Sequence, residues 1–319
     1  MRAYIIRRLL LVIPTLFLLS IIVFLTVRFI PGDVVDAMLS EMQWEGGGDL
    51  DRATLEHRLG LDVPVWMQYG RWIGDMFRHG SLGRSLWRDL PVEEEILSRL
   101  PVTIELGLLA IFIGLVIALP VGIYSAMRQD TAADYLGRSV AIIGLATPNF
   151  WLAIMVLIYP TIWWGWTPPL EYTPLTEDPL GNLAGFFIPS LILGTAMAAA
   201  TMRMTRTMTL EVLRQDYIRT AWSKGMAERV VIVRHTLKNA LIPVVTLVGL
   251  QMPILVGGAV IMENIFALPG LGRLMLDALQ SRDYPVVQGT NLFFATGVVL
   301  LNLVIDLIYP YLDPRVRYE

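Results

Sequence analysis

The sequence predicts an all-α membrane protein with six transmembrane helices. Hydrophobic residues make up 55% of the 319 residues and charged residues only 17%, whereas soluble domains carry about a quarter charged residues. Several apolar runs also reach the length of about 20 residues that a helix needs to cross ~30 Å of hydrocarbon. Most of the chain is therefore expected to lie in lipid, as one transmembrane domain over residues 1–319.

The first apolar run follows three arginines, as a signal peptide would. It is longer than the usual core of about 7 to 15 residues and no small-x-small cleavage site precedes Pro31, so we predict a retained span. Runs bounded by charge, proline or glycine define the other spans. In the fifth, Gly257, Gly258 and Ala259 are small enough to allow close helix approach. The expected spans are residues 9–30, 102–127, 139–164, 185–200, 241–262 and 289–309.

The charge distribution predicts that both termini face the cytoplasm. Lysine and arginine are enriched in cytoplasmic segments, and the loop 203–240 holds eight basic and three acidic residues, a balance of +5. The segment 31–100 holds thirteen acidic and seven basic residues and is expected on the other side. Six spans place the two ends of the chain together. We therefore expect a multi-pass protein of the cell's inner membrane, with lipid as its main surroundings.

The extracytoplasmic segment 31–100 is too long for a simple connector. Trp66, Tyr69, Trp72 and Met76 recur at spacings of three to four residues, which predicts an amphipathic helix on the membrane surface or against the bundle. Such a helix could shape an entrance to the bundle. A structural lid without ligand contact is the alternative.

Several kinds of chemistry find no support in the sequence. No phosphate-binding loop of the form G-x-x-x-x-G-K-[ST] is present, so the chain is not expected to hydrolyse ATP. The chain has no cysteine and only three, widely spaced, histidines, which argues against a metal centre or a catalytic triad. We expect no bound cofactor, no enzyme activity and no nucleic-acid partner.

Two carboxylates, Glu105 and Asp306, fall inside expected spans. Ionisable groups in the bilayer are costly and usually have partners or line water. They are candidates for a proton relay, which an ion-coupled transporter would need. The alternative is that they tie neighbouring helices together near the membrane surfaces.

The loop 203–240 is expected to form two helices with a break. Residues 211–224 lack proline and glycine, Gly225 supplies a helix end, and a second helix is expected from Ala227 until Pro243 interrupts it. Helical spacing places Tyr217, Ile218, Ala221 and Trp222 on one face. Aromatic groups beside arginine suit a protein interface, although a basic surface attracted to anionic lipid is an alternative.

Motifs along the chain resemble the permease subunits of binding-protein-dependent ABC importers. Their cytoplasmic loop carries Glu-Ala-Ala, a glycine and a distal proline, and here Arg219, Thr220 and Ala221 are followed by Gly225. The first glutamate is replaced and the distal end is degenerate, as in the oligopeptide, dipeptide and nickel branch, whose Tyr-x-Arg-Thr-Ala-x-x-Lys-Gly is matched from Tyr217. Further matching segments are FIPGD, LGLDVPVWMQY, SLGRSL, PVEEEILSRLPVTIELGLLA, TPNFWL, GGAVIMENIFALPGLGRL, RDYPVVQG and DLIYPYLDPRVR.

The resemblance implies the first of two permeases in a type I importer, with a cytoplasmic coupling helix and a long extracytoplasmic loop after the first span. The implied partners are a second permease, one or two ABC ATPase subunits that bind ATP and Mg²⁺, and an extracytoplasmic binding protein. Di- or oligopeptides are the implied substrates; nickel complexes, glutathione and oligosaccharides are alternatives. The implied coupling residues are Tyr217, Arg219, Thr220, Ala221, Lys224 and Gly225. Residues implied near the pore mouth or the binding protein are Glu263, Phe266, Pro269, Gly270 and Gly272.

Overall fold

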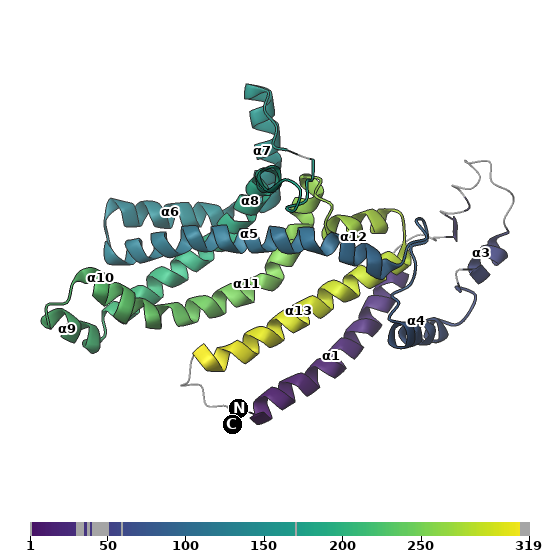
Figure 1. Cartoon of the computed structure of the whole chain (residues 1–319), viewed down its shortest axis with the longest axis horizontal. Helices are drawn as coiled ribbons and strands as arrows, with labels where there is room; N and C mark the ends of the chain where they lie inside the picture. Colours follow the sequence, from purple (N-terminus) through teal and green to yellow (C-terminus); the bar gives the residue numbers. More distant parts are fainter. Residues whose placement is uncertain are drawn as a thin grey trace. The chain divides into compact units, whose positions relative to one another are not determined.

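A computed structural model describes residues 2–29, 35–36, 39, 51–58, 60–169 and 171–312. Three parts of the expected pattern lie outside the described residues: the undescribed positions of segment 31–100, residue 30 of the first expected span and the end of the last motif. The described residues form helices, with one isolated bridge between Arg84 and Pro91. Figure 1 labels α1 (Arg2–Arg28), α3 (Arg52–Arg58), α4 (Val65–His79), α5 (Val92–Met127), α6 (Ala132–Ala146), α7 (Asn149–Trp164), α8 (Pro179–Leu213), α9 (Asp216–Ser223), α10 (Glu228–Val230), α11 (Leu237–Ile265), α12 (Leu271–Gln280) and α13 (Tyr284–Leu312).

Five helical stretches in the described residues are long and apolar enough to cross a membrane: Ile6–Arg28, Val92–Met127, Pro179–Leu213, Glu228–Ile265 and Tyr284–Leu307. Each overlaps one expected span. The helices continue well beyond the apolar runs, because polar residues extend a helix into water without ending it. The stretch Glu228–Ile265 includes α10, a π-helical segment (Val231–Thr236) and α11 in succession.

The third expected span, residues 139–164, is not one straight helix. It covers parts of α6 and α7, which are bent by 95° at the break between them and could form a sixth, broken span. Thr147 at the end of α6 has an extended backbone, and Pro148 precedes α7. A residue before proline is disfavoured from the helical region by the proline ring. The bend therefore follows from Thr147-Pro148, which hydropathy does not detect.

The chain divides into two compact units, which we describe separately. In the unit of Val102–Pro269 with the residues from Leu301 onward, α5, α7, α8 and α11 surround a core that includes Leu106, Ala153, Phe186 and Met262. The crossing of α5 and α8 is especially close. A Cβ atom added at Gly194 would lie 2.7 Å from the Ala110 carbonyl oxygen, so only glycine fits there. Figure 1 shows α6 alongside α5 in this unit.

The small residues singled out in the fifth span have different roles. A Cβ atom at Gly258 would lie 2.8 Å from Leu193 Cδ2, whereas one at Gly257 would meet nothing within 4 Å. Ala259 is 2% exposed. Close approach in α11 therefore depends on Gly258 and Ala259.

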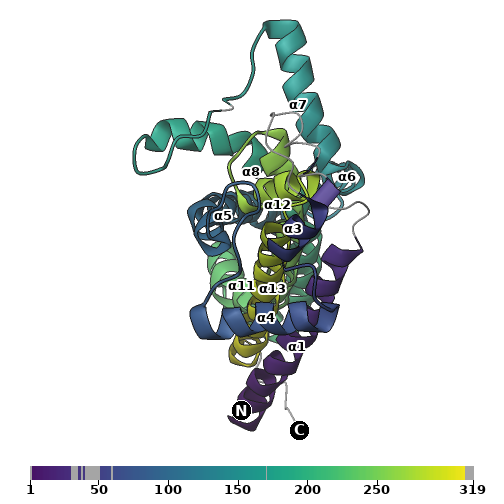
Figure 2. The ribbon, with the colours of Figure 1, turned by 90° about the vertical axis from the view of Figure 1, so that its right-hand side faces the viewer.

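In the unit formed by the chain up to Pro101 and Gly270–Leu300, α4 packs crosswise on α1 (Figure 2). The rings of Tyr69 and Trp72 lie 5.3 Å and 5.9 Å, centroid to centroid, from the ring of Phe24 in α1. Trp66 and Phe77 of α4 remain 75% and 81% exposed. The expected amphipathic helix is thus present, and one of its aromatic faces lies against a transmembrane helix.

Candidate functional site

The expected loop 203–240 is a helical hairpin, and we use that name for these residues. Its first arm is the end of α8, which runs for 35 residues. At 1.5 Å per residue, α8 measures roughly 50 Å, about 20 Å more than the hydrocarbon core. Its second arm is α10, the π-helical segment and the start of α11, and α9 lies between the two arms. The hairpin must therefore extend beyond the membrane.

One face of α9 is buried inside the hairpin. Ile218 is 0% and Ala221 is 6% exposed, and both pack in a cluster with Val231, Val212, Leu213 and Met226. This small core holds α9 across the ends of both arms (Figure 1). Of the four residues expected on one face, Ile218 and Ala221 point inward, and Tyr217 and Trp222 lie at the two edges of this buried face.

The remaining surface of α9 is exposed, with Tyr217 and Trp222 at the borders of the buried face. Tyr217 and Trp222 are each 43% exposed, and Arg219, Thr220 and Lys224 are also exposed. The Arg219 side chain is 74% exposed and lies 3.4 Å from Asp216 of the same helix. Exposed aromatic groups interleaved with cations form a mixed apolar and basic surface. Such composition is typical of protein interfaces.

Two polar features fix how α9 joins its neighbours. Gly225 follows α9 with φ at +72°, and its N–H donates to the Trp222 carbonyl oxygen at 2.9 Å. Left-handed backbone of this kind favours glycine. The Tyr217 hydroxyl accepts a hydrogen bond from Asn239 Nδ2 at 2.8 Å and donates to the His235 carbonyl oxygen at 3.4 Å. The Gly225 turn ends α9, and the Tyr217 hydroxyl connects the start of α9 to the second arm.

The second arm differs from the sequence expectation. Pro243 does not end a helix, because α11 continues through it to Ile265. Proline is tolerated in transmembrane helices where its neighbours compensate for the lost hydrogen bond. The irregularity lies earlier, in the π-helical segment Val231–Thr236, where the Thr236 hydroxyl donates to the Val231 carbonyl oxygen at 3.2 Å. π-Helical turns frequently occur at functional sites.

A buried ion pair connects the first arm to two other helices. Arg206 Nε and Nη2 of α8 each lie 2.8 Å from one carboxylate oxygen of Asp134 in α6. Ser125 of α5 also donates to Asp134, as does Arg138 at 2.9 Å. Asp134 is 0% exposed. Sequence reasoning counted Arg206 only as a basic loop residue, because nothing local pairs it with a carboxylate 72 positions earlier.

The residues implied near the pore mouth are mostly buried within this chain. Glu263 and Phe266 are 0% exposed, and Glu263 Oε1 accepts from the Thr103 hydroxyl at 2.6 Å. Gly270 and Gly272 are buried at the start of α12, and Pro269 is half-buried. These side chains shape the turn between α11 and α12. Their burial leaves Glu263 and Phe266 no exposed surface for a partner, and the position of this segment near the pore mouth or the binding protein stays a prediction.

The two intramembrane carboxylates differ in their surroundings. Glu105 in α5 is half-buried, and its Oε2 atom accepts from Asn182 Nδ2 of α8 at 3.4 Å. Asn182 also donates to the Thr173 carbonyl oxygen at 2.9 Å, so Glu105 helps to connect α5 with α8. Asp306 is half-buried in α13. Glu105 thus has the helix-connecting surroundings that were the alternative to a proton relay.

Tyr172 lies close to this polar group, outside the spans. Its ring packs edge-on against Phe186 at 6.2 Å between centroids. Burial, and to a smaller extent the charge of Glu105, raise the pKa of the Tyr172 hydroxyl above its ordinary value. The hydroxyl is therefore neutral at physiological pH.

Comparison with known proteins identifies relatives over the full length. Residues 1–107 match the family described as "Binding-prot-dependent transport system membrane comp, N-term", and residues 118–318 match "Binding-protein-dependent transport system inner membrane component". A peptide transport system permease protein of Brucella abortus is 41% identical over 319 residues. The dipeptide transport system permease protein of Escherichia coli K12 is 40% identical over 344 residues. Both alignments cover 100% of each chain.

A solved structure supports the fold. The crystal structure of an amino acid ABC transporter with histidines is similar at a TM-score of 0.52, covering 70% of this chain and 95% of that one. Its sequence identity to this chain is 16%. The fold is that of a type I ABC permease.

Proposed function

The chain belongs to the family of binding-protein-dependent transport system inner membrane components, and we propose that this ABC importer subunit forms half of a translocation pathway for di- or oligopeptides. The single observation that carries the substrate class is the full-length similarity to permeases named for peptide and dipeptide transport. The same machinery can serve nickel complexes, glutathione or oligosaccharides. No described side chain favours those substrates.

The exposed face of α9 is the proposed docking site for an ATPase subunit. Support comes from the exposure of Trp222, Arg219 and Lys224 and from the small core that holds α9 rigidly to both arms. A rigid helix between α8 and α11 can convert movement of a partner into rocking of one helix bundle against another. Ala221 and Gly225 would then position the docking surface rather than touch the partner.

The complete importer is proposed to contain further subunits. A second, homologous permease would complete the pathway, an extracytoplasmic binding protein would deliver the substrate, and one or two ATPase subunits would bind ATP and Mg²⁺. Both termini of this chain would face the cytoplasm. The balance of +5 in residues 203–240 supports this orientation, because basic residues are enriched on the cytoplasmic side.

The proposal is tested by transport into liposomes that contain both permeases and the ATPase subunits, with the binding protein outside. Uptake of radiolabelled dialanine is expected to require ATP and to stop when ATP is removed, even if a proton gradient is maintained. Uptake driven by the proton gradient alone would instead favour an ion-coupled transporter using Glu105 or Asp306. ATP-dependent uptake of a nickel complex but not of dialanine would contradict the peptide assignment.

A further inference from the structure

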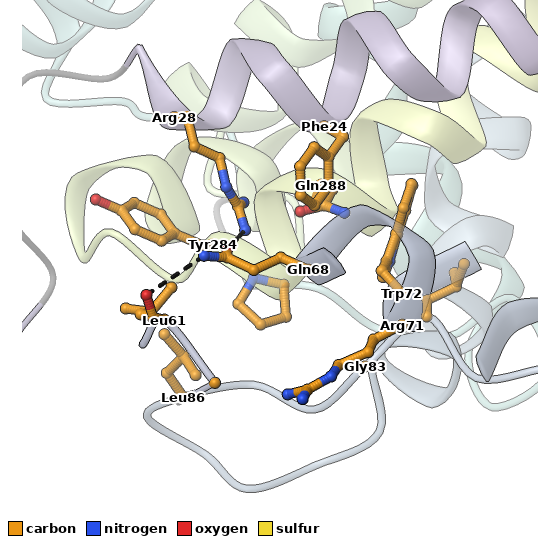
Figure 3. Close-up of a pocket in the computed structure, with 13 residues that line it drawn as sticks. Phe24, Arg28, Leu61, Gln68, Arg71, Trp72, Gly83, Leu86, Tyr284 and Gln288 are labelled. Atoms are coloured by element: carbon orange, nitrogen blue, oxygen red, sulfur yellow. Dashed lines mark hydrogen bonds between the residues drawn. The ribbon is translucent and has the colours of Figure 1, made fainter. Parts of the chain in front are cut away.

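A pocket of about 200 Å³ lies between α1, α4, the segment after α4 and the start of α13. Figure 3 shows the side chains of Arg28, Gln68, Arg71 and Trp72 arranged around it, together with Gln288 of α13. All of its lining residues belong to one compact unit. None of them is among the residues considered above for coupling or for the pore mouth.

The pocket is cationic. Among the described residues, its lining includes two arginines and no carboxylate. The guanidinium of Arg28 lies 4.0 Å above the Phe24 ring and donates to Gln68 Oε1. Gln68 is held in turn, because its Nε2 donates to the Val63 carbonyl oxygen at 2.8 Å. Arg28 is therefore fixed in position and retains further N–H donors.

Asp62, an acid on which the charge of Arg71 acts, already has another partner. Asp62 Oδ2 lies 2.6 Å from His57 Nδ1. This hydrogen bond holds the pKa of Asp62 below its ordinary value, with a smaller contribution from the charge of Arg71. Arg71 itself is exposed, and its closest described contact is Met67 Sδ at 4.0 Å. Its guanidinium is thus able to turn towards a ligand.

The indole of Trp72 and the amide of Gln288 also lie around the pocket. The indole Nε1–H of Trp72 is buried and finds no acceptor among the described residues. Gln288 is a buried polar residue at 4% exposure and lines the same space. Buried polar groups are nearly always hydrogen-bonded in folded proteins. A ligand that satisfies the N–H of Trp72 must bring an acceptor atom.

One wall of the pocket is held in place by a network of hydrogen bonds. Asp283 Oδ2 accepts from the Ser85 hydroxyl at 2.5 Å and Oδ1 accepts from the Leu86 N–H at 3.1 Å. The indole of Trp87 donates to the Ser281 carbonyl oxygen at 2.8 Å. These bonds fasten residues 85–87 to residues 281–283 before a ligand arrives. Prearranged walls reduce the entropy lost on binding.

We propose that this pocket binds an oxyanion, either a carboxylate or a phosphate group, between Arg28 and Arg71. Arginine forms charge-assisted hydrogen bonds with both groups. Arg28 ends a transmembrane helix, the level at which lipid phosphates lie, and a free peptide also carries one carboxylate. The proposal concerns this pocket alone and does not depend on the transported substrate.

The test uses the full-length chain and two pairs of probes, and in each pair the first probe carries one more unit of negative charge than the second. Native mass spectrometry compares retention of phosphatidylglycerol with that of phosphatidylcholine, and equilibrium dialysis compares dialanine with its C-terminal amide. Arg71→Gln is expected to weaken binding of the anionic probe about tenfold, since a charge-assisted hydrogen bond contributes about 1.5 kcal/mol or more. Arg78→Gln is the matched control, because Arg78 is an exposed arginine of α4 outside the pocket.

Trp72→Phe keeps an aromatic ring beside Tyr69 and removes the N–H donor together with part of the indole, and it is expected to weaken binding a few-fold. Preferential binding of phosphatidylglycerol identifies a lipid phosphate as the ligand, and preferential binding of dialanine over its amide identifies a peptide carboxylate. Either result supports the proposed oxyanion site if Arg71→Gln weakens binding of the preferred probe and Arg78→Gln does not. Two results would overturn the proposal: equal binding of the two probes within both pairs, or equal effects of Arg71→Gln and Arg78→Gln on binding.

Discussion

Individual side chains connect the hairpin to the helices that carry it. Arg206 bonds to both oxygens of Asp134, and Ser125, Arg138 and the N–H of Asp130 also donate to this carboxylate. Four or more donors offset most of the free-energy cost of burying a carboxylate. Removing the carboxylate or its counter-ion leaves the other charge buried without compensation. Asp134 therefore makes α5, α6 and α8 move together.

We predict that Asp134→Ala destabilises the full-length chain by about 3 kcal/mol, because it leaves Arg206 buried without its counter-ion. Thermal unfolding in detergent measures this loss. Asp130→Asn is the control, because Asp130 is an exposed neighbour 3.6 Å from Arg138 and asparagine tolerates its φ of +61°; loss of this charge is expected to cost less than about 1 kcal/mol. Equal unfolding temperatures for the two variants would show that the ion pair does not hold the helices.

Gly225 predicts an order of effects among three substitutions. Its φ of +72° suits glycine, is tolerated by asparagine, costs alanine about 1 kcal/mol and is incompatible with proline. A Cβ atom there would meet nothing within 4 Å, so backbone strain alone sets the order. Hydrogen exchange of the α9 amides is expected to increase from Gly225→Asn through Gly225→Ala to Gly225→Pro. An equal rate in the alanine and proline variants would contradict this account of the turn.

Whole helices show what sequence reasoning can and cannot reach. Hydropathy located every long apolar helix, because membrane crossing requires an unbroken apolar run. It did not locate the break in residues 139–164, since Thr147-Pro148 changes backbone geometry without changing hydropathy. The hairpin was predicted from Gly225 and the charge pattern. Its inward face was not predicted, because the direction of Ile218 and Ala221 depends on Val231 and Val212 in other helices.

Helix α9 thus has two faces with different tasks. A charged residue at Ala221 would disturb the small core before it reached any partner, because Ala221 is 6% exposed. Variants meant to probe docking belong on the outer face, at Arg219, Trp222 or Lys224. The same burial argument applies to Glu263 and Phe266, which motif similarity alone placed near a partner.

The crossing of α5 and α8 yields a matched pair of variants. Gly194→Ala would place its Cβ atom 2.7 Å from the Ala110 carbonyl oxygen, whereas Gly257→Ala would meet nothing within 4 Å. Overpacking of this kind costs about 1–3 kcal/mol, and alanine in an open helical position is neutral or favourable. We predict that only Gly194→Ala lowers the midpoint of thermal unfolding. A lower midpoint for both, or for neither, would contradict the close crossing.

The entire chain combines two features that an importer subunit needs. Long apolar helices provide the membrane domain, and the hairpin extends a rigid, basic and partly aromatic surface beyond it. The substrate class rests on the peptide permeases that are similar over the full length. The geometry of the hairpin and its motif resemblance both favour docking to an ATPase subunit.

Site-specific cross-linking in the assembled importer tests this docking directly, and the chain is well suited to it because it contains no cysteine. Lys224→Cys places a single thiol on the outer face of α9, and Gln129→Cys places one on an exposed turn after α5 that is expected on the same side of the membrane. A short cysteine-to-lysine cross-linker is then added to complexes with the ATPase subunits. The account predicts an adduct between Lys224→Cys and an ATPase subunit whose yield changes with ATP. No adduct, or no more than Gln129→Cys gives, would contradict it.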